Sequence, residues 1–200
     1  MPMPTLPPRH ALALFTLLIA VMGVTRIHHF AAIPDASWAV FFVAGFYLRA
    51  HWRWAFPILM AAAVLADAYA IGRAGMDFWG HYCVSPAYWA LLPSYLALWM
   101  GGAWLAQQQP GLAWRSLGML CASFWLSVSV CYLLSNGSFY WFSSSWGGTP
   151  SVGGWFANLG HWYLPFLRTT GMYVAAAALL HAAALATGLV PLRTTQRPAT

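Results

Sequence analysis

Long apolar segments separated by short polar breaks run along most of this chain. A hydrocarbon core about 30 Å thick takes roughly 20 apolar residues per helix, fewer where the end residues reach the interface. The pattern therefore predicts an all-α integral membrane protein, with six membrane-spanning helices in one domain over residues 1–200. We expect the helices near Ala11–Ile27, Ser37–Leu48, Trp54–Ile71, Ala87–Ala106, Leu112–Leu134 and Trp162–Val190.

The segments differ in length and in how they are joined. The second is short for a span and suits a tilted helix or a thin membrane, whereas the last is long enough to begin outside the bilayer. Residues 136–161 are rich in Gly, Ser and Trp, so we expect a loop there. Arg9 precedes the first apolar run as in a signal peptide, but no clean small-residue cleavage pattern follows, which favours a retained first helix.

The composition supports lipid as the main solvent. The chain is 61% hydrophobic and 6% charged, and a soluble domain of 200 residues needs far more charge to cover its surface. Nine Arg against three Asp are too sparse for a nucleic-acid-binding face, so no nucleic-acid partner is expected. Three Cys without paired spacing argue against a disulfide framework.

The arginines predict the orientation. With both termini in the cytoplasm, six of the nine arginines fall on the inner side, which satisfies the positive-inside rule, and the opposite topology violates it. We therefore expect a multi-pass protein of the bacterial inner membrane whose outer half faces the periplasm. The six are Arg9, Arg49, Arg53, Arg115, Arg193 and Arg197.

The other ionisable residues collect in the opposite half. All three acids, Asp35, Asp67 and Asp77, fall there with four histidines, and the inner half has little beyond its arginines, His10 and His51. Asp67 lies in an apolar helix, where a charge costs about 3 kcal/mol unless it is paired or faces a cavity. Its partner could be Arg26, Arg73 or His28. The asymmetry predicts a polar cavity open to the outside, covered by the loop at 136–161.

Four residues are candidates for chemistry on that side. Cys83 precedes the fourth helix, whose positive end favours a thiolate, and a thiolate is a soft ligand for a transition metal. The alternative for Cys83 is a small packing residue. His28 is either a site residue or a solvated interfacial histidine. Arg168 suits an acid or an anionic group of a ligand. Aromatic residues such as Phe42 belong to the lipid belt or core, or stack on a flat ligand.

Several short elements together resemble one family. The sequence is similar to the BtuM family of solitary substrate-binding components related to energy-coupling-factor transporters, which handle cobalamin. The most specific element is Cys83-Val84-Ser85-Pro86-Ala87-Tyr88, which follows a helix that bears an aspartate. The likeness covers residues 10–106 most closely and includes Thr25–Phe30, Asp35–Ala39, Phe42–Arg49 and Phe56-Pro57 with Asp67.

This resemblance implies a six-helix bundle whose outward loops bind cobalamin, a cobalt-containing corrinoid, for uptake across the inner membrane. It implies that Cys83 is the metal ligand on the lower axial face of cobalt and an electron donor. A thiolate there labilises an upper ligand such as cyanide, so reductive decyanation would accompany a function that is primarily transport. The expected corrinoid-binding residues are His28, Phe42, Asp67, Ser85, Tyr88 and Arg168.

A partner module is also implied, although the sequence departs from the pattern. Related components dock an energising ATPase and transmembrane module through small residues at four-residue spacing on the first helix. Here that helix has Ala11, Ala13, Thr16, Ala20 and Gly23 without a clean Ala-x-x-x-Ala, so the energy source stays open.

Two other functions fit the pattern. One is a membrane redox protein that ligates haem between His28 and either His81 or His161. The other is a structural or assembly membrane protein without a small ligand. The sequence contains no nucleophile elbow, phosphate loop, HExxH or CxxC motif.

Overall fold

The chain forms a bundle of helices. The computed structural model describes residues 7–27, 34–81, 84–108, 111–143 and 149–188, and no β-strand occurs in these ranges. This confirms the all-α prediction. Two short 3₁₀ helices, η1 (Arg49–His51) and η2 (Pro86–Ala90), accompany the α-helices. These are α1 (Pro8–Ile27), α2 (Ser37–Leu48), α3 (Trp52–Arg73), α4 (Leu91–Gln107), α5 (Trp114–Phe142) and α6 (Val152–Ala186).

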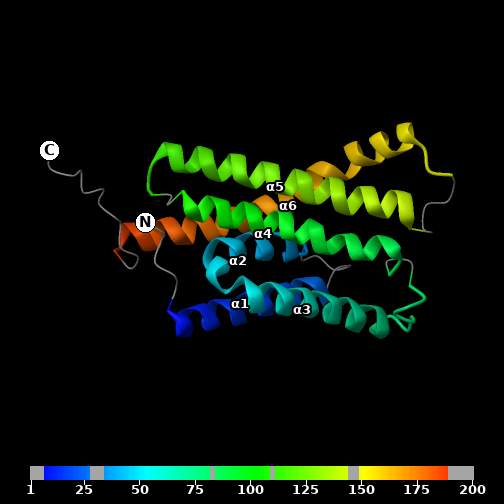
Figure 1. Cartoon of the computed structure of the whole chain (residues 1–200), viewed down its shortest axis with the longest axis horizontal. Coiled ribbons are helices and arrows are strands. Elements are labelled where there is room, and N and C mark those ends of the chain that lie inside the picture. The colour runs from blue at the N-terminus through cyan, green and yellow to red at the C-terminus, as the bar shows by residue number, and fades with distance from the viewer. Residues whose placement is uncertain (1–6, 28–33, 82–83, 109–110, 144–148, 189–200) are drawn as a thin grey trace.

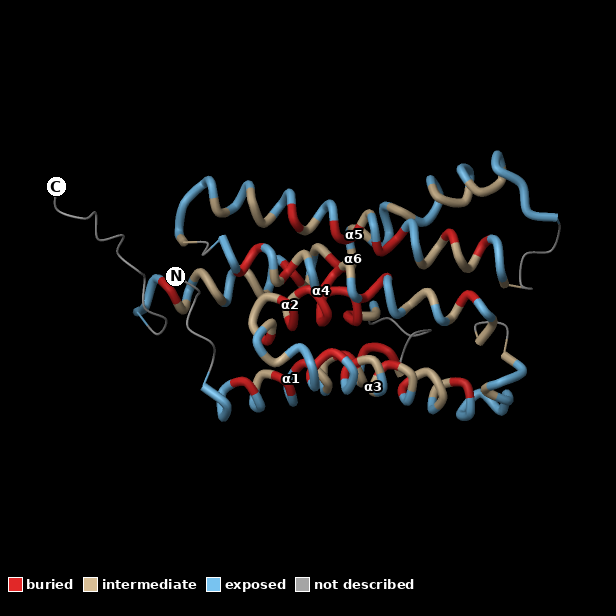
Figure 2. The backbone as a smooth tube through the Cα atoms, in the orientation of Figure 1, coloured by how far each residue is buried: buried red, intermediate tan, exposed pale blue. Residues whose placement is uncertain are grey.

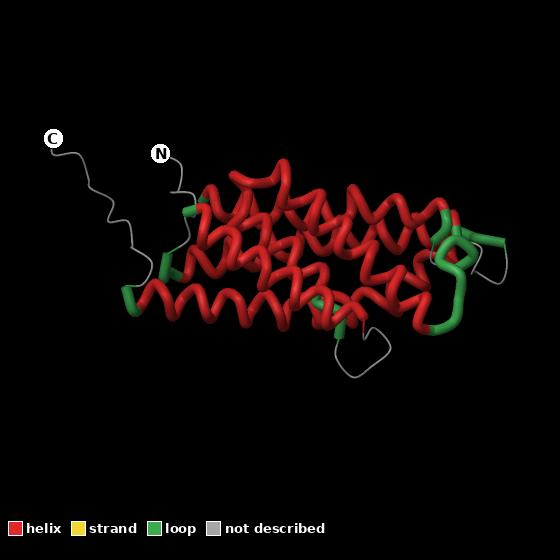
Figure 3. The backbone as a smooth tube through the Cα atoms, turned by 90° about the horizontal axis from the view of Figure 1, so that it is seen from below, coloured by secondary structure: helices red, strands yellow, loops and turns green. Residues whose placement is uncertain are grey.

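The helices lie roughly along one long axis (Figures 1 and 3). The start of α1 and the end of α6 lie at the same end of the bundle, together with the end of α4 and the start of α5. We call this the terminal end. The end of α3, the start of η2, the end of α5 and the start of α6 lie at the other end, which we call the loop end.

The short helix α2 is the centre of the bundle. Nine of its twelve residues are buried, on all sides of the helix, and Figure 2 shows it between the other helices. Its length of about 18 Å is well below the thickness of a hydrocarbon core. An apolar helix of this length is typical of a protein core, and that explains why its apolar pattern has no polar face.

The chain reverses at η1, between α2 and α3. The rings of Phe41 and Phe56 pack edge to face with their centroids 5.6 Å apart. In one continuous helix, residues fifteen positions apart would be separated by about 22 Å along the axis. The α2–η1–α3 stretch is therefore a hairpin of two antiparallel helices.

Glycines bring α2, α4 and α5 unusually close. A Cβ atom on Gly45 would collide with the backbone of Trp99, and one on Gly102 would collide with the backbone of Phe42. On the neighbouring position, a Cβ on Gly101 would lie 2.6 Å from the Ser127 side chain of α5. Small residues allow backbone-to-backbone packing in membrane bundles, where there is little hydrophobic force between helices.

In the part of the chain that the structure describes, four helical stretches are long and apolar enough to cross a membrane, one of which is the α2–η1–α3 hairpin. They carry large apolar side chains on the outside of the bundle, such as Leu65 and Leu180, which are 69% and 74% exposed. A surface of this kind suits lipid as the solvent, so the chain is a membrane-embedded protein. The four stretches are Pro8–Ile27, Ser37–Arg73, Trp114–Phe142 and Val152–Ala186.

The prediction of a loop at 136–161 is wrong for most of the described residues in this range, which are helical. Helix α5 continues to Phe142 and α6 begins at Val152, ten residues before the predicted start. The Ser151 side chain caps α6 by accepting a hydrogen bond from the Gly154 amide. The Tyr140 hydroxyl donates to the Ser151 carbonyl and accepts from the Ser151 amide. These tertiary contacts stabilise a helical path that the Gly- and Ser-rich composition disfavours.

Candidate functional site

An arginine on α1 is the centre of a buried polar cluster toward the loop end. Arg26 lies in the last turn of α1, and only 8% of its surface is exposed. Its Nε donates to Oδ1 of Asp67 at 2.6 Å, and its Nη2 donates to Oδ2 at 2.7 Å. This two-point geometry is the strongest form of an arginine–carboxylate pair. It ties the end of α1 to α3.

The third nitrogen of Arg26 reaches α2 and α4. Nη1 donates to the Ser37 hydroxyl at 3.0 Å, to the Tyr95 hydroxyl at 2.9 Å and to Oδ2 of Asp35 at 3.2 Å. Asp35 in turn accepts hydrogen bonds from the amide and the hydroxyl of Ser37, at 2.9 and 2.6 Å. Because Asp35 and Ser37 stand at the start of α2, the guanidinium fixes where the central helix begins.

Tyr88 brings η2 into the same cluster. Its hydroxyl donates to Oδ2 of Asp67 at 2.7 Å. The phenol is the donor in this contact, because the ionised Asp67 carboxylate can only accept. We call Arg26, Asp35, Ser37, Asp67, Tyr88 and Tyr95 the Arg26 cluster.

The cluster carries one positive and two negative formal charges in a largely apolar bundle. Ions are costly to bury, and they persist where each is paired and its hydrogen-bonding groups are used. In this cluster the arginine donates to four different side chains. The arrangement connects α1, α2, α3, η2 and α4, and so it holds the segment after residue 83 against the bundle.

The structure joins two of the predicted site residues and separates others. Asp67 and Tyr88 are hydrogen-bonded, and Ser85 stands immediately before η2 with a buried hydroxyl that has no partner among the described residues. Cys83 and His28 lie outside the described residues. Of the three partners considered for Asp67, Arg26 is the one the structure pairs with it.

Phe42 and Arg168 do not join this group. Phe42 is 2% exposed and lines an apolar cavity toward the terminal end. Its ring packs edge to face on Phe124 of α5 at 6.3 Å. Arg168 lies exposed on α6. Arg73, another partner considered for Asp67, is exposed and lies 5.9 Å from the ring of Tyr69.

Three polar residues with hydrogen-bonding roles in the structure were not among the predicted site residues. Tyr95 and Ser37 are fully or almost fully buried hydrogen-bond partners of Arg26. The third is His181, toward the terminal end, whose Nδ1 lies 2.8 Å from the Tyr47 hydroxyl oxygen. His181, like Asp67, is an ionisable residue within an apolar segment, and this pattern could have identified it as a candidate functional residue. The seven-residue spacing of Tyr88 and Tyr95, two turns of a helix, signals a shared face.

The described histidines and cysteines form no metal centre. Within the ranges that the structure covers, no three His, Cys, Asp or Glu side chains are close enough to hold a metal ion. His161 is exposed and packs against Trp162. Cys131 is buried in the core, as expected of a packing residue, and Cys121 is exposed.

Comparison with known proteins finds no family model that matches this chain and no matching curated protein.

Proposed function

We propose that this protein binds cobalamin at its periplasmic face and takes it up across the bacterial inner membrane. The observation that carries the proposal is the anchoring of the Cys83–Tyr88 element. That element resembles the cobalt-binding segment of the BtuM family, and its last residue donates a short hydrogen bond to Asp67. Asp67 is held in turn by both sides of the Arg26 guanidinium.

The charge distribution supports the orientation. Four described arginines, at positions 9, 49, 53 and 115, lie on segments at the terminal end. Asp67 and Asp77 lie toward the loop end, on and after the last turns of α3. With the terminal end in the cytoplasm, the arginines follow the positive-inside rule and the Cys83 segment faces the periplasm.

In this proposal all six helices belong to the membrane domain. The helix α4, at 17 residues and about 25 Å, is close to the thickness of a hydrocarbon core. The helix α2 lies within the membrane but is shielded from lipid by its neighbours. Its start, at Ser37, is placed at membrane depth by the Arg26 cluster, as is usual for polar groups that face a bundle interior.

The chemistry assigned to Cys83 is ligation of the cargo metal. The thiolate would donate an electron pair to the lower axial position of cobalt and form a cobalt–sulfur bond, and the nucleotide-base nitrogen or water that holds this position would leave with its own electron pair. A strongly donating ligand weakens the bond opposite to it. In cyanocobalamin the cobalt–carbon bond then breaks, and cyanide leaves with both bonding electrons and takes a proton from water. The cobalt oxidation state does not change in this exchange, so the proposal covers the loss of cyanide and not the reduction that the resemblance also implies.

Tyr88 and Asp67 act as positioning residues in this proposal. Tyr88 fixes the turn of η2 that follows Cys83, and Asp67 fixes Tyr88. Ser85, whose buried hydroxyl has no hydrogen-bond partner among the described residues, is the residue that we assign to an amide side chain of the corrin ring. In this proposal Cys83 is the cobalt ligand, and Tyr88 and Asp67 hold its segment in position.

Growth of a bacterial strain that lacks cobalamin uptake, on trace vitamin, tests the transport function. The native chain should restore growth and Cys83→Ser should not, while Cys121→Ser serves as the matched control because Cys121 is an exposed cysteine to which the proposal gives no role. Equal rescue by Cys83→Ser would remove this cysteine from the mechanism. Repeating the assay in a strain without any energising ATPase module shows whether the chain works alone.

Absorption spectra of the purified chain with cyanocobalamin test the ligand exchange. The cyanide-ligated spectrum should disappear in the native protein and in Cys121→Ser, and persist in Cys83→Ala. Loss of cyanide with Cys83→Ala would contradict the axial-ligand role. A Soret band in protein purified without added corrinoid would instead favour the haem alternative.

A further inference from the structure

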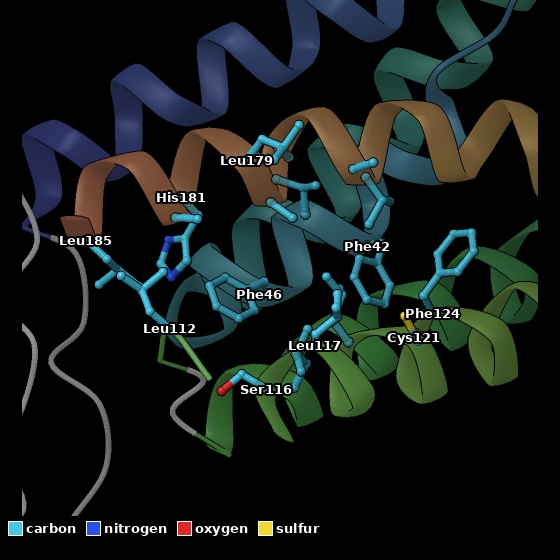
Figure 4. A pocket seen from close by; sticks show the side chains of 18 of the residues that line it. Phe42, Phe46, Leu112, Ser116, Leu117, Cys121, Phe124, Leu179, His181 and Leu185 are labelled. Carbon is cyan, nitrogen blue, oxygen red and sulfur yellow. The ribbon is translucent and has the colours of Figure 1, made fainter. Parts of the chain in front are cut away.

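An elongated apolar cavity lies toward the terminal end of the bundle, away from the Arg26 cluster. It has a volume of about 520 Å³, within the range of small-molecule sites. Figure 4 shows its walls, with α6 on one side, the first turns of α5 on the other and α2 between them. Its side chains include Phe42, Phe46, Leu117, Phe124 and Ala178.

A polar pair marks one end of this cavity. His181 of α6 and Tyr47 of α2 both line it, and their Nδ1 and hydroxyl oxygen are 2.8 Å apart. The His181 ring also packs edge to face on Phe46 with the centroids 5.4 Å apart. When Tyr47 donates to Nδ1, the other ring nitrogen of His181 carries a hydrogen and is a donor.

Most of this cavity is too apolar to bind ordered water. A buried water needs two to four polar partners, and the polar groups here are confined to the end near His181, Tyr47 and Ser116. An empty cavity would lose the dispersion contacts of its aromatic and aliphatic walls. A lipid alkyl chain restores these contacts at little cost, because it leaves an environment as apolar as the cavity.

Positive charge surrounds the end of the bundle where the cavity lies. Arg115 directly precedes Ser116, a lining residue, in the first turn of α5. The positive end of the α5 dipole points to the same place. Arg49 follows α2 and donates to the carbonyl of Phe46, another lining residue. All three acids of the chain belong to other regions of the fold.

We propose that this cavity is a binding site for one acyl chain of an anionic phospholipid. The chain lies between α5 and α6, and the negatively charged headgroup meets Arg115 and the start of α5. The His181 donor is placed for an ester or phosphate oxygen near the same end. The proposal goes beyond cobalamin uptake and depends only on the protein being embedded in a membrane, so each can fail without the other.

Native mass spectrometry of the full-length chain tests the proposal. The protein is reconstituted in nanodiscs with equal phosphatidylglycerol and phosphatidylcholine and then transferred to detergent. We expect one retained phosphatidylglycerol, favoured over phosphatidylcholine by about tenfold, equivalent to about 1.4 kcal/mol. Arg115→Gln should reduce the preference for phosphatidylglycerol.

Two cavity-filling variants probe opposite walls. Ala178→Phe on α6 and Leu117→Trp on α5 should each lower retention of phosphatidylglycerol by about tenfold. Ala183→Phe is the matched control, because Ala183 is exposed on α6 and does not line the cavity; retention should stay native. Leu117→Trp keeps the test valid if Ala178→Phe does not fold, because Leu117 is 46% exposed.

Four outcomes would overturn the proposal. These are equal retention of the two phospholipids, unchanged retention in the folded cavity-filling variants, retention of a neutral prenyl lipid in place of the phospholipid, and a dimer that the cavity-filling variants abolish. The last two would assign the cavity to a quinone-like molecule or to a second copy of the chain.

Discussion

Arg26 and Asp67 lie 41 positions apart in the sequence and form a two-point ion pair, with nitrogen–oxygen distances of 2.6 and 2.7 Å. Their side chains are 9% and 20% exposed. Through further hydrogen bonds, the pair also contacts Ser37 at the start of α2 and Tyr88 in η2, before α4. Its loss would therefore disturb both the helix positions and the segment that carries Cys83.

The first prediction concerns the charge balance of this pair. Asp67→Asn keeps the shape of the side chain but leaves the buried guanidinium with a weaker partner. Breaking one side of a buried pair costs about 3–5 kcal/mol, so we expect a large loss of stability. Thermal unfolding of the protein in mild detergent measures it.

Arg73→Gln is the matched control for this experiment, because Arg73 is an exposed arginine that the sequence also allows as a partner for Asp67. Its unfolding temperature should stay close to native. An unfolding temperature for Asp67→Asn equal to that of Arg73→Gln would show that the ion pair contributes nothing to stability. The double variant Arg26→Met with Asp67→Leu should recover part of the loss, because apolar side chains of similar volume avoid the burial of charge.

The second prediction concerns the hydroxyl of Tyr88. Tyr88→Phe removes a hydrogen bond to a charged carboxylate, worth about 1.5–3 kcal/mol, and leaves the ring in place. We expect lower stability together with weaker cobalamin binding, because η2 is no longer tied to α3. Thermal unfolding and a cobalamin titration of the same sample measure the two effects.

Tyr69→Phe provides the comparison, because Tyr69 is exposed on the same helix as Asp67. It should leave both measurements unchanged. Native cobalamin affinity in a destabilised Tyr88→Phe protein would restrict Tyr88 to a structural role.

The third prediction concerns the closest helix contact. Gly102→Ala places a methyl group against the backbone of α2, which rigid helices cannot accommodate without moving apart. Overpacking of this kind typically costs about 1–3 kcal/mol. In contrast, Gly23→Ala and Gly118→Ala meet open space and should stabilise their helices by about 0.5–1 kcal/mol. Thermal unfolding of the three variants should give opposite signs, and a stabilised Gly102→Ala would contradict the packing argument.

The fourth prediction concerns orientation. Alkaline phosphatase, which is active only outside the cytoplasm, should be active when fused after Met76 and inactive when fused after Leu112. Met76 lies at the loop end, beyond α3, and Leu112 lies at the terminal end, before α5. Activity in the reverse pattern would place the Cys83 segment in the cytoplasm and would exclude periplasmic capture of cobalamin by that segment.

The sequence by itself determined the helical class, the approximate positions of the six helices and the location of the acidic residues in one half. It did so because apolar runs broken by Gly, Pro and charged residues are local signals. The loop predicted at 136–161 from local composition was wrong. There, the Ser151 cap and the contact of Tyr140 with Ser151 stabilise helices in Gly- and Ser-rich segments. Propensity is a weak preference that tertiary contacts override.

Tertiary structure alone decided which partner Asp67 takes, because an ion pair depends on how α1 and α3 pack and Arg26, Arg73 and His28 are equally possible in one dimension. It also decided that α2 is a core helix, because a largely apolar segment of twelve residues gives the same sequence pattern whether lipid or other helices surround it. The pairing of Tyr47 with His181 has the same origin: 134 positions separate them, and only the packing of α6 on α2 brings them together.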